Sequence, residues 1–488
     1  MTKLKIKIAT VALSLAIMGT GCSKFLDVNE NPNKPTTADI KLLLPSAAAS
    51  TSHVLSNQFG INAGLWAQYW TQSPFSSQYK TNDRYLNPGT SSDRTWLIIW
   101  RNALQNYEGV IKNYGQFSQH GAIAYLLKAY TFQMATDAWG DIPLKEALKG
   151  GDSLSVGYDS QEAVYDSVFS WISKGQALID PANQFKPGAE DLFFSGDMDQ
   201  WRRFANTLKL RAYLRIVKAN PAKAEAGIRA LQTANATFLE KDAKITYSSS
   251  GGNENPMFSE ILGLGRTQNL VASSTAIDAM TANKDPRLKA LYTTVTNEYN
   301  GVDIDTIIGI PQGSYGTIPG FAVSFPSAAT GGLGDDNNSA LAPVIFLSAS
   351  ESYFLQAEGV VRGWLAGSAV TLFHNGITAS FTANNLAAAA PAYIAAAPDA
   401  QWPANNTNDA QIKAIITQKY YAMNGKQTFE AWTEWRRTGF PSFFVVSKVG
   451  ALGAGKFPLR LPYPNTELTT NAKFPGAIKL DVPVWWDK

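Results

Sequence analysis

Residues 411–441 constrain the fold more than any other segment, because they read as two short helices joined by a sharp bend. Apolar residues recur at helical spacing in both halves of the segment. Asn424 and Gly425 interrupt this pattern, as expected for a pair that tolerates positive φ, and Gly439 followed by Pro441 ends the second helix. Two antiparallel helices of this length cannot bury their apolar faces against each other alone. The segment therefore predicts a mainly α-helical fold in which helical pairs stack on further pairs.

The rest of the chain divides into a helical body and less regular parts. Helical periodicity covers residues 41–240 and 344–445, where Trp, Tyr and Ala recur in a manner similar to tetratricopeptide units, although no clean repeat period can be counted. Residues 241–343 are rich in Gly, Ser, Asn and Pro, and we expect an irregular insert with small ordered pieces. Residues 446–488 form a second irregular segment. Together, residues 41–488 are expected to form one domain.

Local patterns give more specific expectations. The apolar run 344–365 predicts one strong helix, 306–310 predicts a short strand, and the polar and aromatic residues 71–95 predict a loop. Residues 199–218 predict a helix with one apolar face and a basic face that is solvated and pairs with neighbouring carboxylates. The basic residues of this helix are Arg202, Arg203, Lys209, Arg211 and Arg215.

The first 21 residues have the form of a signal peptide. Lys3, Lys5 and Lys7 form a positively charged start, and residues 8–18 form an apolar run too short to anchor stably in a bilayer. We therefore expect residues 1–21 to be removed.

Cys22, the only cysteine in the chain, follows small residues in the manner of a bacterial lipoprotein cleavage site, where the cysteine is acylated. A single cysteine in an exported protein has no intramolecular disulfide to form, so it needs another role. We expect lipidation at Cys22 and an extended polar tether over residues 22–40. The alternative is an ordinary secreted protein whose cysteine happens to lie near the cleavage site.

Net charge gives no support for nucleic-acid binding. The chain has 42 Lys and Arg against 39 Asp and Glu, and the three excess positive charges all lie ahead of Cys22. The remainder is neutral, so it lacks the positive field that binds nucleic acid. No apolar stretch after Met18 is long enough to cross a membrane, so membrane contact is expected through the lipid alone.

The sequence contains no constellation for metal, thiol or nucleotide chemistry. His53, His120 and His374 are far apart, and none has a second ligand three or four residues away. No cysteine is available in the body for thiol catalysis. Residues 450–456 imitate a phosphate-binding loop, but Phe457 stands where Ser or Thr would hold magnesium. We expect no catalytic residue, no cofactor and no metal site.

Carboxylates could still support glycosidase chemistry, which needs only two acids at a fixed separation. The candidates are Asp137, Asp141, Glu351 and Glu358. The last two lie within a predicted helix among packing positions, so structural roles are expected for both. The oxygen-rich residues 335–338 leave calcium binding open.

Aromatic residues in polar loops are the main candidates for ligand binding. An aromatic ring stacks on the C–H face of a sugar, while amide and charged groups satisfy its hydroxyls. The alternative is that these rings only hold the loops against the helical body. The candidate ligand contacts are Gln72, Phe75, Tyr79, Arg84, Tyr85, Trp96 and Tyr315.

Short motifs occur in a fixed order along nearly the whole chain. They include Gly-Asp-Ile-Pro-x-x-Glu-Ala-Leu at 140–148 and Trp-Arg-Arg-Thr-Gly-Phe-Pro at 435–441. The full set lies at residues 22–33, 140–148, 201–211, 285–288, 351–358, 418–419, 435–441 and 460–464. Together they resemble the SusD-like family of Bacteroidota outer-membrane lipoproteins, in particular its SusD/RagB nutrient-binding branch.

The resemblance implies a right-handed superhelical body of tetratricopeptide-like pairs, with the insert 241–343 on the ligand side. Such proteins sit at the cell surface on the outer membrane, where they act as the lid of a TonB-dependent, SusC-like transporter and capture oligosaccharides or other nutrients. The family's ligand contacts lie in no shared motif, so the candidate residues named above rest on local composition alone.

We therefore expect a lipoprotein that binds a nutrient, in the first place a glycan, without converting it. Two alternatives remain from the residues themselves: a lipid-anchored glycoside hydrolase, and a helical-repeat scaffold that binds peptides. Glycan, glycopeptide and peptide ligands are all compatible with aromatic loops.

Overall fold

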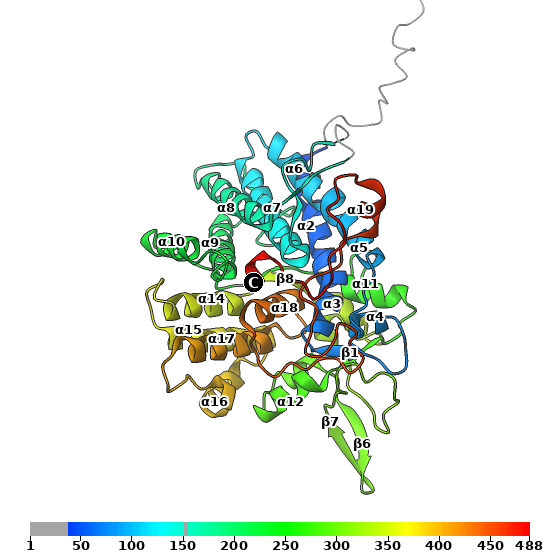
Figure 1. Ribbon diagram of the computed structural model, residues 1–488. Helices are drawn as coiled ribbons and strands as arrows, with labels where there is room; N and C mark the ends of the chain where they lie inside the picture. Colours follow the sequence, from blue (N-terminus) through cyan, green and yellow to red (C-terminus); the bar gives the residue numbers. More distant parts are fainter. Residues whose placement is uncertain (1–37, 151–154) are drawn as a thin grey trace, which may run out of the picture. The chain divides into compact units, whose positions relative to one another are not determined.

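Helices that pack in pairs make up most of the structure of residues Ile40–Lys488 (Figure 1). The computed structural model describes residues 38–150 and 155–488. The expected signal peptide, Cys22 and nearly all of the expected tether lie outside these residues. The fold is mainly α-helical and tetratricopeptide-like, as the sequence predicts.

The first half of the body is a series of helices in which each contacts the next. These are α2 (Ile40–Ser56), α6 (Gln105–Asn113), α7 (Ser118–Trp139), α8 (Gln161–Ala177), α9 (Met198–Arg215) and α10 (Pro221–Thr233). Helix α9 also contacts α14, which begins the second half. The second half consists of α14 (Ala349–Val361), α15 (Ala369–Ala383), α17 (Asn408–Met423) and α18 (Thr428–Thr438). Helix α18 packs on α3 (Gln58–Trp66), so the two halves share one core.

Helix ends follow the local chemistry of the sequence. Ser160 caps α8 by accepting a hydrogen bond from the Ala163 N–H at 3.3 Å, and Ser348 caps α14 by accepting one from the Glu351 N–H at 3.0 Å. The bend between α17 and α18 places Gly425 at φ +70°, and Gly439 closes α18 at φ +75°. The bend and the stop predicted within residues 411–441 are therefore confirmed.

The insert and the connecting segments contain the short elements. The strands are β1 (Trp70–Gln72), β2 (Ile142–Pro143), β3 (Tyr158–Asp159), β4 (Ala243–Ile245), β5 (Leu270–Ala272), β6 (Val295–Tyr299), β7 (Val302–Thr306) and β8 (Val344–Leu347). They form antiparallel pairs β1–β5, β2–β3, β4–β8 and β6–β7. The remaining α-helices are α4 (Lys80–Asp83), α5 (Thr90–Leu97), α11 (Pro256–Gly263), α12 (Ser274–Ala282), α13 (Leu288–Leu291), α16 (Ala390–Ala396) and α19 (Asn465–Thr470). A π-helical segment (Ile98–Leu104) joins α5 to α6, and short 3₁₀ turns lie at Ala328–Thr330, Asn337–Leu341, Ala387–Ala389, Pro398–Ala400 and Trp485–Asp487.

Three local predictions differ from the structure. The run 344–365 is not one helix, because its first four residues form the fully buried strand β8, which pairs with β4. A short apolar run fits a buried strand as well as a helix, so periodicity could not separate them. The strand predicted at 306–310 lies earlier, as β7 ends at Thr306. The predicted loop 71–95 contains α4 and the first turns of α5.

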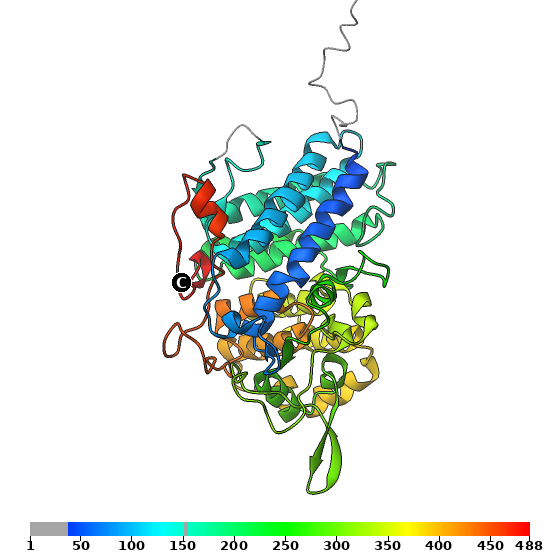
Figure 2. The ribbon, with the colours of Figure 1, turned by 90° about the vertical axis from the view of Figure 1, so that its right-hand side faces the viewer.

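The β6–β7 hairpin projects from the insert in both views of the chain (Figures 1 and 2). Its pairing places directly opposite residues on the same face. One face is largely apolar and exposed, and it carries Val295, Asn297, Tyr299, Val302, Ile304 and Thr306. The other face is acidic and carries Thr296, Glu298, Asp303 and Asp305.

The expectation for the basic residues of α9 is only half right. Arg202, Arg203 and Lys209 are partly exposed, whereas Arg211 and Arg215 are buried. The reason is that α9 faces α18, which presents its own charged residues to the same interior, so the two arginines find carboxylate partners there.

A buried ion-pair network joins α7, α9, α14, α17 and α18. Arg215 donates to Glu434 at 2.8 Å and also pairs with Glu430 and with Asp137 of α7. Arg437 donates to Glu434 at 2.7 Å and to Glu358 of α14 at 2.6 Å. Three of the candidate glycosidase acids therefore have structural partners, because Glu351 likewise lies 3.6 Å from Arg211.

Lysine and carboxylate groups complete the network. Lys419 of α17 is 1% exposed and lies 3.2 Å from Glu434. Burial alone would raise the pKa of Glu434, but Arg437, Lys419 and Arg215 hold it well below its usual value. Glu434 is therefore ionised in the folded protein.

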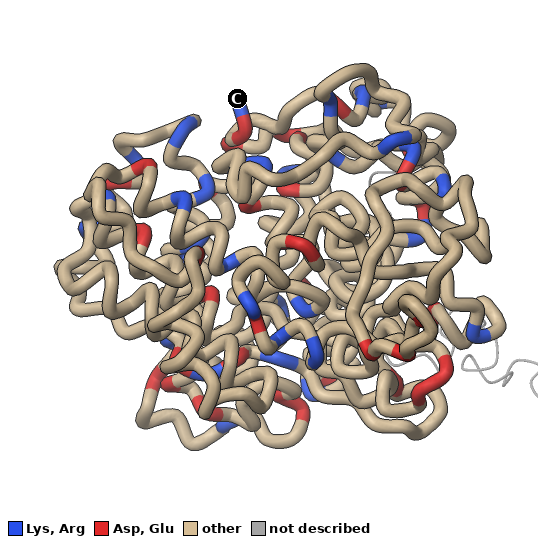
Figure 3. The backbone as a smooth tube through the Cα atoms, turned by 90° about the horizontal axis from the view of Figure 1, so that it is seen from below, with Lys and Arg blue, Asp and Glu red and all other residues tan. Residues whose placement is uncertain are grey.

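Charged residues of both signs are interspersed along the described chain (Figure 3). Basic residues do not collect on one side in this view, and many of them lie beside acidic residues. This arrangement agrees with the neutral balance of the sequence.

Replacing Arg215 by Met should lower the free energy of unfolding by about 3–5 kcal/mol, because Asp137, Glu430 and Glu434 would lose a buried cation. Urea and thermal unfolding measure the change. The matched control is Arg202→Met on the same helix, where a partly exposed pair with Asp199 is broken at a cost below about 1 kcal/mol. Equal effects of the two substitutions would show that the network does not stabilise the fold.

Candidate ligand-binding site

Asp83 joins two segments that lie far apart in the sequence. Its carboxylate accepts hydrogen bonds from Thr71 Oγ1 at 2.7 Å, from the Gln72 N–H at 2.8 Å and from Gln312 Nε2 at 2.8 Å. The Gly313 N–H donates to Thr71 Oγ1 at 3.1 Å. The segment 71–85 is thereby fixed against the insert.

The carboxyl group of Asp83 is fully buried. Burial raises its pKa from 3.8 to about 6, and the hydrogen bonds from Gln72, Thr71 and Gln312 oppose this rise only in part. Keeping the Asp83 carboxylate ionised in the interior therefore lowers the free energy of unfolding, although its hydrogen bonds join the two segments.

Gln72, Tyr85 and Trp96, three of the predicted ligand contacts, have buried side chains in this structure. Gln72 Oε1 accepts from the Tyr79 N–H at 2.6 Å, and Tyr85 Oη accepts from the Ser447 N–H at 3.0 Å. Trp96 packs among aromatic rings of the core, including Trp139. In this conformation these three side chains support the loops rather than face a ligand.

Phe75, Tyr79, Arg84 and Tyr315, the other predicted contacts, lie at or near the surface. Phe75 is 63% exposed, Arg84 is exposed, and Tyr315 is partly exposed with Lys80 Nζ 5.4 Å from its ring centre. Tyr79 is half-buried against the hydrophobic core. We call Phe75, Lys80, Arg84 and Tyr315 the aromatic loop cluster.

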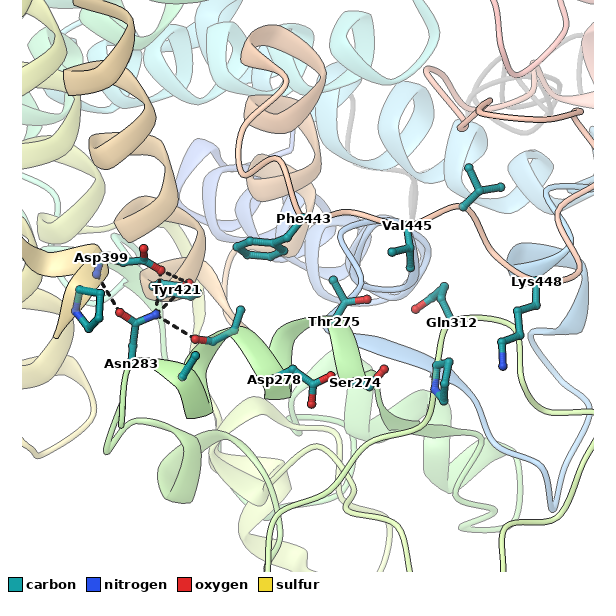
Figure 4. Close-up of a pocket in the computed structure, with 15 residues that line it drawn as sticks. Ser274, Thr275, Asp278, Asn283, Gln312, Asp399, Tyr421, Phe443, Val445 and Lys448 are labelled. Carbon is teal, nitrogen blue, oxygen red and sulfur yellow. Dashed lines mark hydrogen bonds between the residues drawn. The ribbon is translucent and has the colours of Figure 1, made fainter. Parts of the chain in front are cut away.

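A cleft of about 650 Å³ lies next to these segments, between α12 and residues 443–448 (Figure 4). This volume is within the range of pockets that hold small ligands. Its lining residues are Ser274, Thr275, Asp278, Ala279, Ala282, Asn283, Pro311, Gln312, Pro398, Asp399, Tyr421, Phe443, Val445, Val446 and Lys448.

The two long walls of the cleft differ in chemistry. Phe443 and Val445 lie on one side, and Thr275 and Asp278 of α12 lie on the other (Figure 4). An apolar ring and an aliphatic side chain thus face hydroxyl and carboxylate groups. This combination suits a ligand with one apolar face and polar edges, such as a sugar ring.

One end of the cleft is polar and already hydrogen-bonded. Asp399 Oδ2 accepts from Tyr421 Oη at 2.6 Å and from Asn283 Nδ2 at 2.7 Å. Lys448 stands at the opposite end of the cleft in Figure 4. One end of the cleft therefore carries the carboxyl group of Asp399, and the other carries the amino group of Lys448.

Buried side chains hold the apolar wall in place. Gln68 donates through Nε2 to the Val445 carbonyl at 2.7 Å and accepts from the Val445 N–H at 3.1 Å. The Lys448 N–H donates to the Gln312 carbonyl at 3.0 Å, and Tyr85 holds the Ser447 N–H. Tyr85 therefore positions the cleft wall, although its ring does not line the cleft.

Sequence reasoning missed the residues that line the two walls, above all Thr275, Asp278, Phe443 and Lys448. The one available signal was the Phe443–Phe444 pair, which follows the helix stop at Gly439 and Pro441. Nothing in the sequence indicated that α12 would lie opposite this pair.

Within residues 38–150 and 155–488, no three His, Cys, Asp or Glu side chains come together as a metal site. In the oxygen-rich segment 335–338, Asp336 caps a 3₁₀ turn by accepting from the Asn338 N–H at 2.8 Å, and Asn337 accepts from Arg266. One oxygen of each of these two side chains is therefore engaged by the protein itself.

Replacing Asp83 by Asn should remove a pH-dependent part of the stability. The folded-state pKa of about 6 exceeds the ordinary 3.8, so folding favours the protonated form, and the stability that this group contributes is lost as pH rises through about 6. Between about pH 4 and pH 7 the unfolding free energy of the wild type should fall by about 2 kcal/mol relative to Asp83→Asn. Urea unfolding across this range measures the difference, and a flat difference would contradict the burial argument. Asp303→Asn on the exposed hairpin is the control.

Comparison with known proteins agrees with the motifs found in the sequence. The model of the SusD-like family described as "Starch-binding associating with outer membrane" matches residues 32–464. A solved structure of a chitin-binding SusD homologue from Flavobacterium johnsoniae is 25% identical, with a TM-score of 0.74 over 91% of this chain and 98% of that one. A structure described as a chitin-binding protein is 24% identical, with a TM-score of 0.76 over 92% and 100% of the two chains.

A SusD homologue from Bacteroides uniformis has the same fold at 22% identity, with a TM-score of 0.74 over 91% of this chain and 99% of that one. No curated protein matches the chain. The family model spans most of the sequence, so the resemblance seen in the motifs is confirmed, and the hydrolase alternative falls because the family is non-enzymatic. The chain belongs to the SusD-like family, whose members are binding proteins associated with the outer membrane.

Proposed function

We propose that this protein binds glycans at the cell surface and delivers them to a SusC-like, TonB-dependent transporter of the outer membrane. The observation that carries the proposal is the cleft, in which an apolar wall with an aromatic ring faces the Thr275 hydroxyl and the Asp278 carboxylate of α12. Two similar structures are described as chitin-binding, which supports a glycan as the ligand.

The cleft is the primary binding region in this proposal. Phe443 stacks on the C–H face of a sugar ring, while Thr275 and Asp278 hydrogen-bond its hydroxyls from the opposite wall. Gln312 lines the cleft and also bonds to Asp83, so it connects the bound sugar to the aromatic loop cluster.

The aromatic loop cluster is the second contact region in the proposal. Phe75 and Tyr315 offer rings, Lys80 lies over the Tyr315 ring, and Arg84 offers a further charged donor. The buried contacts predicted from the sequence, Gln72, Tyr85 and Trp96, serve the site by fixing these loops, and Tyr79 does the same from its half-buried position.

Attachment to the membrane is proposed through acylated Cys22 and the tether over residues 22–40. In the part of the chain that the structure describes, no helix combines the length and the apolar character that a bilayer span requires. The single cysteine after a stretch of small residues supports lipidation. Several acyl chains would hold a protein of this size at a membrane.

Replacing Phe443 by Leu should weaken glycan binding about three- to tenfold, because the apolar volume remains while the stacking ring is lost. Calorimetric titration with a panel of oligosaccharides measures the affinity, and thermal unfolding checks that the fold is retained. Phe75→Leu tests the aromatic loop cluster in the same way. Tyr299→Leu, on the exposed hairpin, is the control and should leave affinity unchanged. No binding of any oligosaccharide by the wild type would overturn the proposed function.

Replacing Cys22 by Ser should release the protein from the envelope fraction, since the acylated thiol is lost. Mass spectrometry of the mature N-terminus and fractionation of cells measure the effect. An unmodified N-terminus in the wild type, or unchanged fractionation of the variant, would contradict the lipid anchor.

A further inference from the structure

Two charged side chains that line the cleft have no partner in the described structure. The Asp278 carboxylate and the Lys448 ammonium each form no hydrogen bond or ion pair with another described residue. Asp399, the other acid in the cleft, is held by Tyr421 and Asn283. Asp278 and Lys448 are therefore the charges available to a ligand.

The surroundings of Asp278 favour a cationic partner. Burial raises the pKa of its carboxyl group, and no neighbouring charge contributes to this shift. Asp278 lies on α12 and lines a cleft whose opposite wall carries Phe443 and Val445 (Figure 4). The carboxylate is exposed in the free protein, and a ligand seated against the apolar wall would shield it from water. It would then gain more from an ammonium group than from a neutral hydroxyl, because a charge-assisted hydrogen bond is the stronger one.

We propose that Asp278 selects glycans that carry a free amino group, so that the cleft prefers a deacetylated amino-sugar unit to its N-acetylated form. This inference rests on the proposed function, since it names the ligand class of the same cleft. The ammonium group of the sugar sits beside Asp278 and its ring lies against Phe443.

Lys448 gives the bound ligand a direction. Its positive charge repels an ammonium group from its end of the cleft and favours hydroxyl or anionic groups there. An oligomer with one amino-sugar unit is therefore held with that unit at Asp278.

A peptide would also bring an ammonium group, but the structure favours a sugar. Strand β5, which leads into α12, is paired with β1 on one side. On its other side, the Ala272 N–H donates to the Ser324 carbonyl and the Ala272 carbonyl accepts from the Ile310 N–H. The strand thus has no free edge on which an extended peptide could form backbone hydrogen bonds.

The experiment compares three oligomers of equal length and β-1,4 linkage: glucosamine, N-acetylglucosamine and glucose. Calorimetric titration in slightly acidic, low-salt buffer measures the affinity of the full chain for each. For the glucosamine oligomer, Asp278→Asn should lower the affinity about three- to fivefold, the range for a partly exposed ion pair. The same substitution should lower the affinities for the other two oligomers less than twofold, because the Asn amide still hydrogen-bonds a neutral hydroxyl. Added salt should weaken glucosamine binding by the wild type but not by the variant.

Two further variants make the test specific. Asp303→Asn removes an exposed acid on the hairpin, outside the cleft, and should change no affinity. Lys448→Met should leave glucosamine binding intact or strengthen it, because a repelling charge is removed. Loss of glucosamine binding in Lys448→Met would overturn the assignment of the ammonium group to Asp278.

The outcomes separate this inference from the proposed function. If the wild type binds none of the three oligomers or any other glycan, the proposed function itself fails. If it binds them but Asp278→Asn has no effect on the glucosamine oligomer, only the amino-sugar inference fails. Binding of a lysine-containing tetrapeptide that requires Asp278, without Asp278-dependent binding of glucosamine, would overturn the inference in favour of a peptide ligand.

Discussion

The buried ion pairs between α9 and α18 are the interaction on which the rest of the structure depends. Removing a charge from water is costly, and the cost is offset only when each buried ion meets partners at hydrogen-bonding distance. Here the arginines of α9 and α18 and Lys419 of α17 meet carboxylates from α7, α14 and α18. Sliding any one of these helices by a turn would leave an uncompensated charge in the interior. The network therefore fixes which helices are neighbours and in what register. Because residues 443–448 follow directly from α18, it also fixes where the apolar wall of the cleft can begin.

Much of the helical scaffold could be predicted, because its signals are local. The cap at Ser160, the bend at Gly425 and the stop at Gly439 act through backbone groups a few residues away. Predictions were wrong where a segment's conformation or burial depends on a contact with residues distant in the sequence. The residues of β8 were predicted to begin a helix, but in the structure they form a strand because they pair with β4. Arg211 and Arg215 were predicted to be solvated, but in the structure they are buried because glutamates of α18 form ion pairs with them.

The candidate site shows the same division between local and distant signals. Polar residues around aromatic rings are a local pattern, so composition could single out residues 71–95, where Phe75 and Arg84 are exposed. Composition could not tell which of these rings are buried. Tyr85, for example, is fixed in the interior with its hydroxyl accepting a hydrogen bond from the Ser447 N–H, 362 residues away in the sequence. The cleft was missed for the same reason, as α12 and residues 443–448 come together only through contacts such as those of Gln68 and Gln312.

The alternation of apolar and acidic residues in the β6–β7 arm fixes how its two strands pair. A shift of its pairing by one residue would bring aspartate and glutamate onto the face that holds Tyr299 and Ile304, so the alternation of its sequence guards the native pairing. A lone two-stranded ribbon is only marginally stable in water. Within this one, Asn297 accepts from the Ala322 N–H at 2.7 Å and donates to the Ala322 carbonyl at 3.1 Å. At the base of the arm, Thr293 and Ile308 bond to Phe325 and Ser324. The side chain of Asn297 thus extends this anchorage into the arm as a short substitute for a third strand.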